Sequence, residues 1–283
     1  MRPSARVLDL FAVPDAVQPL PGRRGRSVRA GDLVLSPGRD AATQEWVSPL
    51  VARLAVDLDH DPTRRRQDLR VAVPVPARDG SWVVEGWAAS RYEPGTVACR
   101  DLEVTRAAGH LLHARLASLV TERPAQLRTR TDRWALAERV AFGEAPAPEL
   151  GGEPAALVAR TLAATGDDPV SGTAQLVHAD LAGNVLLDPA GAPVVIDVSP
   201  AWRPPRWADA VCVLDFVVRY GAPRAALAPW AHPPGRGAML RAIAFRLLSD
   251  RADDPADDRA EDPAEVDAYA AALSAVTDLP TSG

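Results

Sequence analysis

The sequence predicts an α+β protein with a strand-rich first third and a helix-rich remainder. Up to residue 93, apolar residues occur mainly in short runs separated by Gly, Pro and Asp, which is typical of strands and hairpins. Beyond that point they recur every three or four positions, as on the buried face of a helix, except at one central hairpin. This change predicts two lobes, over residues 1–93 and 94–283, with the boundary near Pro94.

The first lobe begins with strands and one helix. A turn over residues 21–27 contains two glycines and is followed by strand-like runs, the clearer of them over 33–35. Apolar residues at four-residue steps then predict a helix over 43–54. Because Pro49 lies inside this stretch and has no backbone N–H, we expect the helix to be kinked or to begin later.

A β-hairpin is predicted next, because the runs 69–76 and 81–92 are joined by the tight-turn dipeptide Asp79-Gly80. Helices dominate the second lobe. One of them is mostly apolar and contains Asp209 and Asp215, and a buried aspartate requires a partner. The predicted helices cover residues 101–119, 134–142, 153–164, 207–220, 237–249 and 266–276.

Composition limits the chemistry of the chain. Its net charge of −5 and the lack of a long basic stripe argue against nucleic acid as a main partner. All 32 basic residues are arginine, which excludes a phosphate-binding loop that ends in lysine and a Schiff-base lysine. Cys99 and Cys212 are too isolated for a disulfide framework. Since neither a signal peptide nor an apolar run of roughly 20 residues is found, we expect a cytoplasmic protein without a membrane partner.

The stretch with the most chemical information is residues 175–202, QLVHADLAGNVLLDPAGAPVVIDVSPAW. It opens with an apolar run that ends on His178, and a polar loop that carries Asp180 follows. Two short apolar runs, 185–187 and 194–196, are then separated by Asp, Pro and Gly. Such runs predict a β-hairpin.

Asn184 stands just before the first strand of this hairpin, and Asp197 stands just after the second. Antiparallel pairing brings such positions to the open end, with Cα atoms roughly 5 Å apart if directly opposed. An amide oxygen and a carboxylate there suit Mg²⁺ together with phosphate oxygens, and Asp180 is a separate carboxylate that could orient or deprotonate a hydroxyl. The alternative is a surface hairpin in an unrelated α+β protein, with His178 only capping a strand.

The order of these parts resembles the catalytic loop and metal-binding hairpin of kinases. Asp197 is not followed by Phe-Gly, and in this respect the sequence resembles the aminoglycoside and choline phosphotransferases among the proteins with that fold. LVHADLAGNVLL with VIDVSPAWRPP resembles a bacterial branch of aminoglycoside phosphotransferase-like proteins. The resemblance implies a bilobal protein-kinase-like fold, with Asp180 acting on the acceptor hydroxyl, His178 bracing the loop, and Asn184 and Asp197 holding Mg²⁺. The step from Asp180 to Asn184 is one residue shorter than in most of these kinases.

The same resemblance implies that ATP binds to the first lobe, where a glycine turn would cover its phosphates. An ordinary hairpin has the same pattern. The strand over 33–35 ends at Ser36, where these kinases carry a phosphate-binding lysine. The run that ends at Tyr92 resembles the hinge that bonds the adenine edge, although a plain strand leaving a sheet looks alike. The implied nucleotide-binding residues are Gly22, Gly25, Ser27, Ser36, Glu45, Ser90 and Tyr92.

Glu45 resembles the helix glutamate that pairs with the kinase lysine. In this chain it could pair with Arg29 or Arg39 instead, or be an exposed first-turn acid favoured by the helix dipole. Together these observations predict a phosphotransferase that uses ATP and Mg²⁺ and acts on a hydroxyl of a small molecule. The missing lysine and the short loop leave two alternatives, a weak or inactive relative that binds nucleotide or a partner, and a scaffold that binds no nucleotide.

Overall fold

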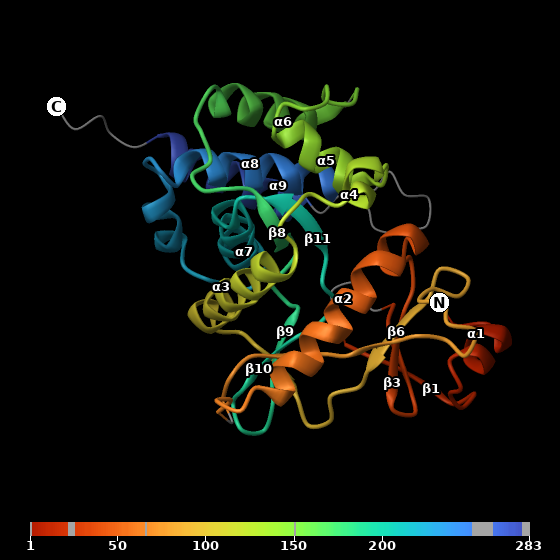
Figure 1. Ribbon diagram of the computed structural model, residues 1–283. Helices are drawn as coiled ribbons and strands as arrows, with labels where there is room; N and C mark the ends of the chain where they lie inside the picture. Colours follow the sequence, from red (N-terminus) through yellow and green to blue (C-terminus); the bar gives the residue numbers. More distant parts are fainter. Residues whose placement is uncertain (1, 22–25, 66, 150, 251–262, 279–283) are drawn as a thin grey trace. The chain divides into compact units, whose positions relative to one another are not determined.

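A computed structural model describes residues 2–21, 26–65, 67–149, 151–250 and 263–278. It confirms the α+β class, with a strand-rich part and a helical part (Figure 1). The chain divides into two compact units. The first comprises Met1–Arg115, Pro124–Arg128 and Gly183–Pro200, and the second comprises Leu116–Arg123, Thr129–Ala182 and Ala201–Gly283. The lobe boundary near Pro94 stays a prediction.

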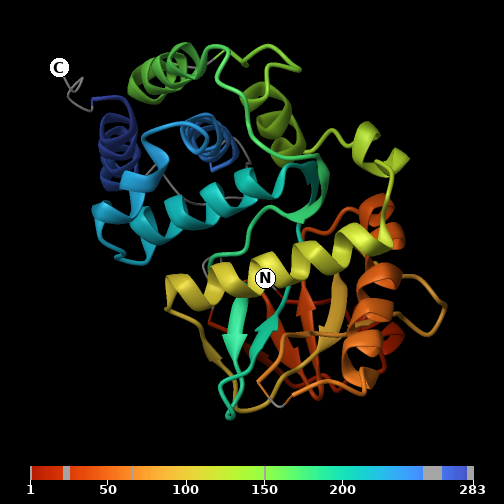
Figure 2. The same cartoon turned by 60° about the vertical axis from the view of Figure 1, so that its left-hand side comes forward.

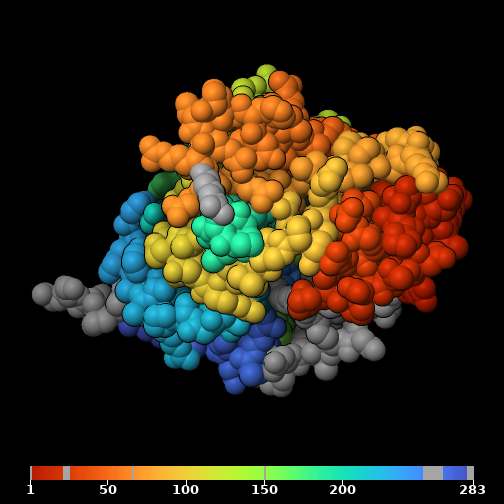
Figure 3. Space-filling view, turned by 90° about the horizontal axis from the view of Figure 1, so that it is seen from below, coloured from red at the N-terminus to blue at the C-terminus, as the bar shows by residue number. Residues whose placement is uncertain are grey.

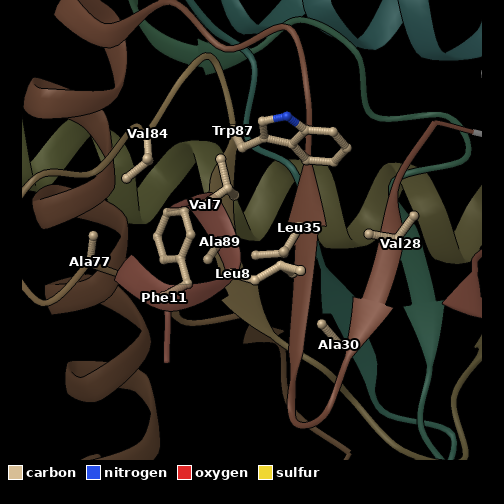
Figure 4. Close-up of a cluster of buried hydrophobic side chains, with 10 residues drawn as sticks. All are labelled: Val7, Leu8, Phe11, Val28, Ala30, Leu35, Ala77, Val84, Trp87 and Ala89. Atoms are coloured by element: carbon tan, nitrogen blue, oxygen red, sulfur yellow. The ribbon is translucent and has the colours of Figure 1, made fainter. Parts of the chain in front are cut away.

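A five-stranded antiparallel sheet forms the main layer of the first unit, in the order β1-β2-β3-β6-β5. Helix α1 (Ala5–Leu10) begins at Ser4, whose Oγ accepts a hydrogen bond from the backbone N–H of Val7. Apolar side chains of α1 pack with those of the sheet in one buried cluster (Figure 4). The strands are β1 (Val17–Pro19), β2 (Val28–Ala30), β3 (Leu33–Ser36), β5 (Pro74–Val75) and β6 (Ala88–Arg91).

Helix α2 (Ala41–His60) is longer at both ends than the predicted helix. It begins earlier because the carboxylate of Asp40 accepts hydrogen bonds from the backbone N–H (2.8 Å) and the hydroxyl (2.6 Å) of Thr43. It continues through Pro49, which is exposed. One apolar face buries Val47, Val51 and Leu54, and we attribute the tolerance of the proline, which costs about 3 kcal/mol inside a helix, to this packing.

A second, four-stranded sheet in the first unit has the order β4-β10-β9-β7, in which β4 and β10 are parallel and the other neighbours are antiparallel. The prediction of a single strand over 69–76 is therefore wrong. Ala72 N–H donates to Val195 of the second sheet, whereas Val73 C=O accepts from Arg91 of the first, so the backbone changes sheets between these two residues. The strands are β4 (Arg70–Val71), β7 (Val97–Ala98), β9 (Val185–Leu187) and β10 (Pro193–Val195).

The hairpin predicted around Asp79-Gly80 is partly confirmed. Strand β5 pairs with β6, and Ala77 and Gly80 form the turn. The second strand begins only at Ala88, because residues 84–87 form a tight bridge in which Glu85 and Gly86 have positive φ.

Helix α8 is the central helix of the second unit, and it contacts α5, α6, α7 and α9 (Figure 2). Almost all of its side chains are buried. Strands β8 (Gln175–His178) and β11 (Pro200–Arg203) pair in a two-stranded sheet. The predicted helices are confirmed as α3 (Leu102–Leu119), α5 (Arg133–Ala141), α6 (Gly152–Thr165), α7 (Pro205–Arg219), α8 (Arg236–Ser249) and α9 (Pro263–Thr277).

Several short elements were not predicted, because they are too short to show a periodic pattern. Besides α1, β1, β7 and β11 they include α4 (Ala125–Thr129) and the 3₁₀ helix η1 (Arg224–Trp230). Within the described parts of the chain, no helix combines the length and the apolar character needed to cross a membrane.

Candidate active site

The predicted central hairpin is present as β9 and β10, with Val185 opposite Val195. Ile196 N–H donates to the carbonyl oxygen of Asn184 at 2.9 Å, which extends the ladder by one pair. Asn184 and Asp197 therefore flank the open end of the hairpin, as the sequence predicts. Their role as metal ligands stays a prediction.

The closed end of the same hairpin is a charged surface. Figure 3 shows this turn beside the segment that follows α2. A hollow of about 380 Å³ there is lined by charged residues, including Arg64 and Arg70. Arg64 pairs with Asp59 at 3.0 Å, and Arg70 pairs with Glu93 at 3.1 Å and with Asp188 at 3.9 Å. These arginines are therefore already matched by acids of the same surface.

Asp197 has an unusual backbone and a charged partner. Its φ of +52° lies in the left-handed region, which residues with a side chain rarely adopt. The guanidinium of Arg39 donates to both carboxylate oxygens, from Nη1 to Oδ1 at 2.5 Å and from Nη2 to Oδ2 at 2.7 Å. This two-bond pair joins residues 158 positions apart within the first unit. It fixes the direction of the Asp197 side chain.

The donor set at this end of the hairpin fits a hard divalent cation. Mg²⁺ is bound in proteins by one or two carboxylates and completes its shell with water and substrate phosphates. Asp197 would supply a carboxylate here, and Asn184 would supply a further oxygen. An ionised carboxylate has about four acceptor positions, so the pair with Arg39 does not exhaust Asp197. Among the described residues, no group of three or more His, Cys, Asp and Glu side chains could hold a metal ion. A metal bound by Asp197 would therefore also depend on Asn184 and on oxygens of the substrate.

The loop that carries Asp180 is anchored at its start. His178 is the last residue of β8 and is fully buried. Its Nδ1 accepts a hydrogen bond from the backbone N–H of Asp180 at 3.2 Å, which requires the proton of a neutral ring to lie on Nε2. This contact connects the buried strand to the backbone of the proposed catalytic aspartate.

Arg246 of α8 reaches the same aspartate from inside the second unit. Its Nη2 donates to Oδ1 of Asp180 at 2.5 Å, and the Asp180 side chain is 40% exposed. Arg246 also donates to Asp215 of α7, from Nε at 3.0 Å and from Nη2 at 2.5 Å. Burial alone would lower the pKa of Arg246, but the carboxylates of Asp215 and Asp180 outweigh it and raise that pKa well above its usual value. Arg246 is therefore a permanent cation.

Asp215 anchors a wider charged network in the second unit. Its second cation is Arg219, which also contacts Asp250 and the hydroxyl of Tyr269. Arg219 Nε donates to Glu265 at 2.6 Å as well. The sequence indicated that a buried Asp215 needs a partner, but it contained no signal that would select Arg246 among 32 arginines.

The residues proposed to bind nucleotide are only partly described. Gly22 and Gly25 lie outside the described residues. Ser27 and Ser36 meet across β2 and β3, with their hydroxyl oxygens 3.0 Å apart. Glu45 is exposed, and its Oε1 accepts from the backbone N–H of Trp82 at 2.8 Å.

Ser90 and Tyr92 lie at the end of β6. Ser90 pairs with Val34 on one side and Pro74 on the other. Tyr92 N–H donates to the carbonyl of Asp32 at 2.8 Å, and the guanidinium of Arg29 stacks 3.9 Å from the Tyr92 ring centre. The nucleotide-binding roles of Ser27, Ser36, Glu45, Ser90 and Tyr92 stay predictions.

Comparison with solved structures identifies the fold. A choline/ethanolamine kinase family protein from Mesorhizobium loti is similar with a TM-score of 0.53 and 19% identity, over 98% of this chain and 94% of that chain. A thermostable mutant of aminoglycoside phosphotransferase APH(4)-Ia is similar with a TM-score of 0.53 and 16% identity, over 94% and 97%. The chain has the aminoglycoside phosphotransferase-like, protein-kinase-like fold.

A third structure with this phosphotransferase-like fold is the complex of gentamicin with APH(2″)-IIa, which is similar with a TM-score of 0.51 and 10% identity, over 98% of this chain and 99% of that chain. No protein-family model matches the sequence, and no curated protein matches it. At 10–19% identity these structures establish the fold. The roles of individual residues stay predictions.

Proposed function

We propose that this chain is a phosphotransferase that transfers a phosphoryl group from ATP to a hydroxyl of a small molecule. The observation that carries the proposal is the fixed position of Asp180, whose backbone is bonded to buried His178 and whose carboxylate is bonded to buried Arg246. An aspartate held in this way, in a phosphotransferase-like fold, is suited to a single orientation toward an acceptor. The similar structures described as kinases and phosphotransferases support the same class of reaction.

Asp180 would accept or orient the proton of the acceptor hydroxyl as the hydroxyl oxygen attacks the terminal phosphorus of ATP, the bond from that phosphorus to the bridging oxygen breaks, and ADP leaves. The buried guanidinium of Arg246 donates to one oxygen of this carboxylate and so fixes its direction. His178 would keep the loop backbone from moving away from the acceptor. Phosphoryl transfer requires mainly positioning and charge neutralisation from the protein, and these contacts would supply the positioning.

Asn184 and Asp197 would hold Mg²⁺ at the open end of the hairpin. A bound Mg²⁺ neutralises charge on the nucleotide phosphates. In this chain the backbone ladder between β9 and β10 sets the spacing of the two residues, and Arg39 sets the direction of the Asp197 carboxylate. We propose no further metal ligand from the protein.

The test is phosphate transfer from labelled ATP in the presence of Mg²⁺, screened over hydroxylated metabolites, amino alcohols and aminoglycosides. We expect Asp180→Asn to reduce the transfer rate by about 10²–10⁴-fold, since it removes the proton acceptor and keeps the side-chain shape. Asp267→Asn, an exposed aspartate of α9, is the matched control and should leave the rate unchanged. Equal rates for Asp180→Asn and the wild type would contradict the proposal.

The second candidate is a weak or inactive relative that binds nucleotide. It is favoured by Ser36, which stands where these kinases have a lysine, and by the occupation of Asp197 by Arg39. This candidate predicts that ATP with Mg²⁺ raises the melting temperature while no acceptor is phosphorylated. A scaffold without a nucleotide site predicts neither effect.

A further inference from the structure

The cation of Arg39 lies on the carboxylate that the proposed function assigns to the metal. Both terminal nitrogens of Arg39 donate to Asp197, at 2.5 and 2.7 Å, in a pair that is only partly exposed, with 20% of the Arg39 side chain and 36% of the Asp197 side chain accessible. Two parallel bonds between a guanidinium and a carboxylate are among the strongest and most directional contacts in proteins. The same planar fork matches the oxygens of a phosphate equally well.

The backbone on either side of Arg39 is fixed. Its N–H donates to the carbonyl of Gly86 at 2.9 Å. The next residue, Asp40, caps α2 through its two bonds to Thr43. The Arg39 backbone is therefore held in place close to the open end of the hairpin. Any movement of the guanidinium would come from rotation about the bonds of the Arg39 side chain.

The position of Arg39 in the sequence also bears on the missing lysine. Strand β3 ends at Ser36, and Arg39 follows three residues later in the same unit. Because the chain contains no lysine, any side-chain cation that binds nucleotide phosphates must be an arginine or a protonated histidine. The left-handed φ of Asp197 is a second sign of function at this point, since such backbone conformations concentrate at functional sites.

We propose that Arg39 is the phosphate-binding cation of the nucleotide site, and that it stays on Asp197 until the nucleotide and the metal bind. Their binding transfers the guanidinium from the carboxylate to the phosphates and leaves the carboxylate to the metal. This inference rests on the proposed function, and it adds the residue that replaces the lysine. It also implies that Arg39 and a metal compete for Asp197 when no nucleotide is present.

Because of this competition, replacing Arg39 should change the affinity for ATP and the affinity for a metal alone in opposite directions. Replacing Arg39 removes the cation that binds phosphates, so the affinity for ATP with Mg²⁺ falls. The same change frees Asp197, so the affinity for a metal alone rises. An ion pair that only stabilises the hairpin would leave the affinity for ATP with Mg²⁺ unchanged when it is broken.

The experiment compares Arg39→Gln with the wild type and with Arg78→Gln, which breaks an exposed ion pair with Asp9 in the same unit. Free Mn²⁺ is measured by electron paramagnetic resonance without nucleotide. ATP and adenosine binding are measured with Mg²⁺ by displacement of a fluorescent nucleotide. For Arg39→Gln we expect tighter Mn²⁺ binding, unchanged adenosine binding and at least tenfold weaker ATP binding, as for a lost charge-assisted hydrogen bond. Arg78→Gln should match the wild type in all three.

The outcomes separate this inference from the proposed function. If the wild type binds no ATP in the presence of Mg²⁺, the proposed function fails and the inference fails with it. If the wild type binds ATP and Arg39→Gln binds it equally well, only the role of Arg39 is overturned. If Arg39→Gln loses the binding of both ATP and adenosine, the binding of ATP by Arg39→Lys is measured next. Recovery of ATP binding by this cation supports the inference, and no recovery overturns it.

Discussion

Arg246 donates a 2.5 Å hydrogen bond to Asp180 from a side chain that is only 1% exposed. The same guanidinium bonds both oxygens of Asp215, so one buried cation is shared between an acid of the helical core and the acid of the proposed catalytic loop. A charge buried in this way is tolerated only while it remains paired. The stability of the second unit and the position of Asp180 therefore depend on the same side chain.

Arg246→Met should destabilise the protein by about 3 kcal/mol, because it leaves Asp215 buried with one of its two arginines removed. Urea unfolding followed by circular dichroism measures this change. Arg53→Met, which breaks an exposed ion pair with Asp57 on α2, is the matched control and should change stability by less than about 0.5 kcal/mol. Equal losses of stability in the two variants would show that the buried ion pair contributes no more to stability than the exposed one.

The double change Arg246→Met with Asp215→Leu should recover at least about half of the stability lost by Arg246→Met alone. Replacing both partners by apolar side chains removes the unpaired charge, and such replacements are often neutral or stabilising. If Arg246 also orients Asp180, phosphate transfer by the double variant should remain low after stability is recovered. Recovery of both stability and transfer would limit Arg246 to a structural role.

Asp197 offers a test that separates backbone strain from charge. Asp197→Asn and Asp197→Ala both remove the carboxylate that pairs with Arg39. Because asparagine tolerates the left-handed conformation better than alanine, we expect the Asn variant to be more stable than the Ala variant by about 1 kcal/mol. Parallel denaturation curves would check this. Equal stabilities would mean that the φ of +52° carries no strain that the side chain relieves.

The pH dependence of stability should reveal the contact between Glu144 and Arg203. Arg203 donates to both oxygens of Glu144, at 2.5 and 2.8 Å, and these hydrogen bonds lower the pKa of Glu144 against the opposing effect of burial. A lowered pKa means that the folded state gains stability at pH values above the unfolded pKa and loses it as the pH falls through the folded pKa. The wild type should therefore exceed Glu144→Gln in stability at pH 7, and the difference should vanish well below pH 4.

Urea unfolding at a series of pH values measures this difference. Glu149→Gln is the control, since Glu149 is exposed and lies in the same loop region. A difference between the wild type and Glu144→Gln that grows toward low pH would contradict the assigned direction of the Glu144 pKa shift.

The amino-acid pattern was sufficient to locate the central hairpin and the residues at its open end. Strand pairing between β9 and β10 is local, and the turn residues between them leave one register. Asn184 and Asp197 therefore had to flank the same end. The long helices were also predictable, because each segment is either apolar along most of its length or has apolar residues every three or four positions.

The change of sheets after Ala72 could not be read from the chain. A run that alternates between apolar and polar residues fits either sheet, and the choice depends on partners that lie far away, Val195 for one sheet and Arg91 for the other. A pattern of alternation specifies which side chains face inward, but it does not name the neighbouring strand.

The cations of the candidate site were decided by tertiary packing alone. Arg39 meets Asp197 across 158 residues, and Arg246 meets Asp180 across 66. The sequence supplies 32 chemically identical arginines, and no local rule distinguishes the ones that will face an acid. Only the folded backbone, which brings the start of α2 to the hairpin and α8 beneath the Asp180 loop, selects these two, because ion pairing depends on distance in space and not on separation along the chain.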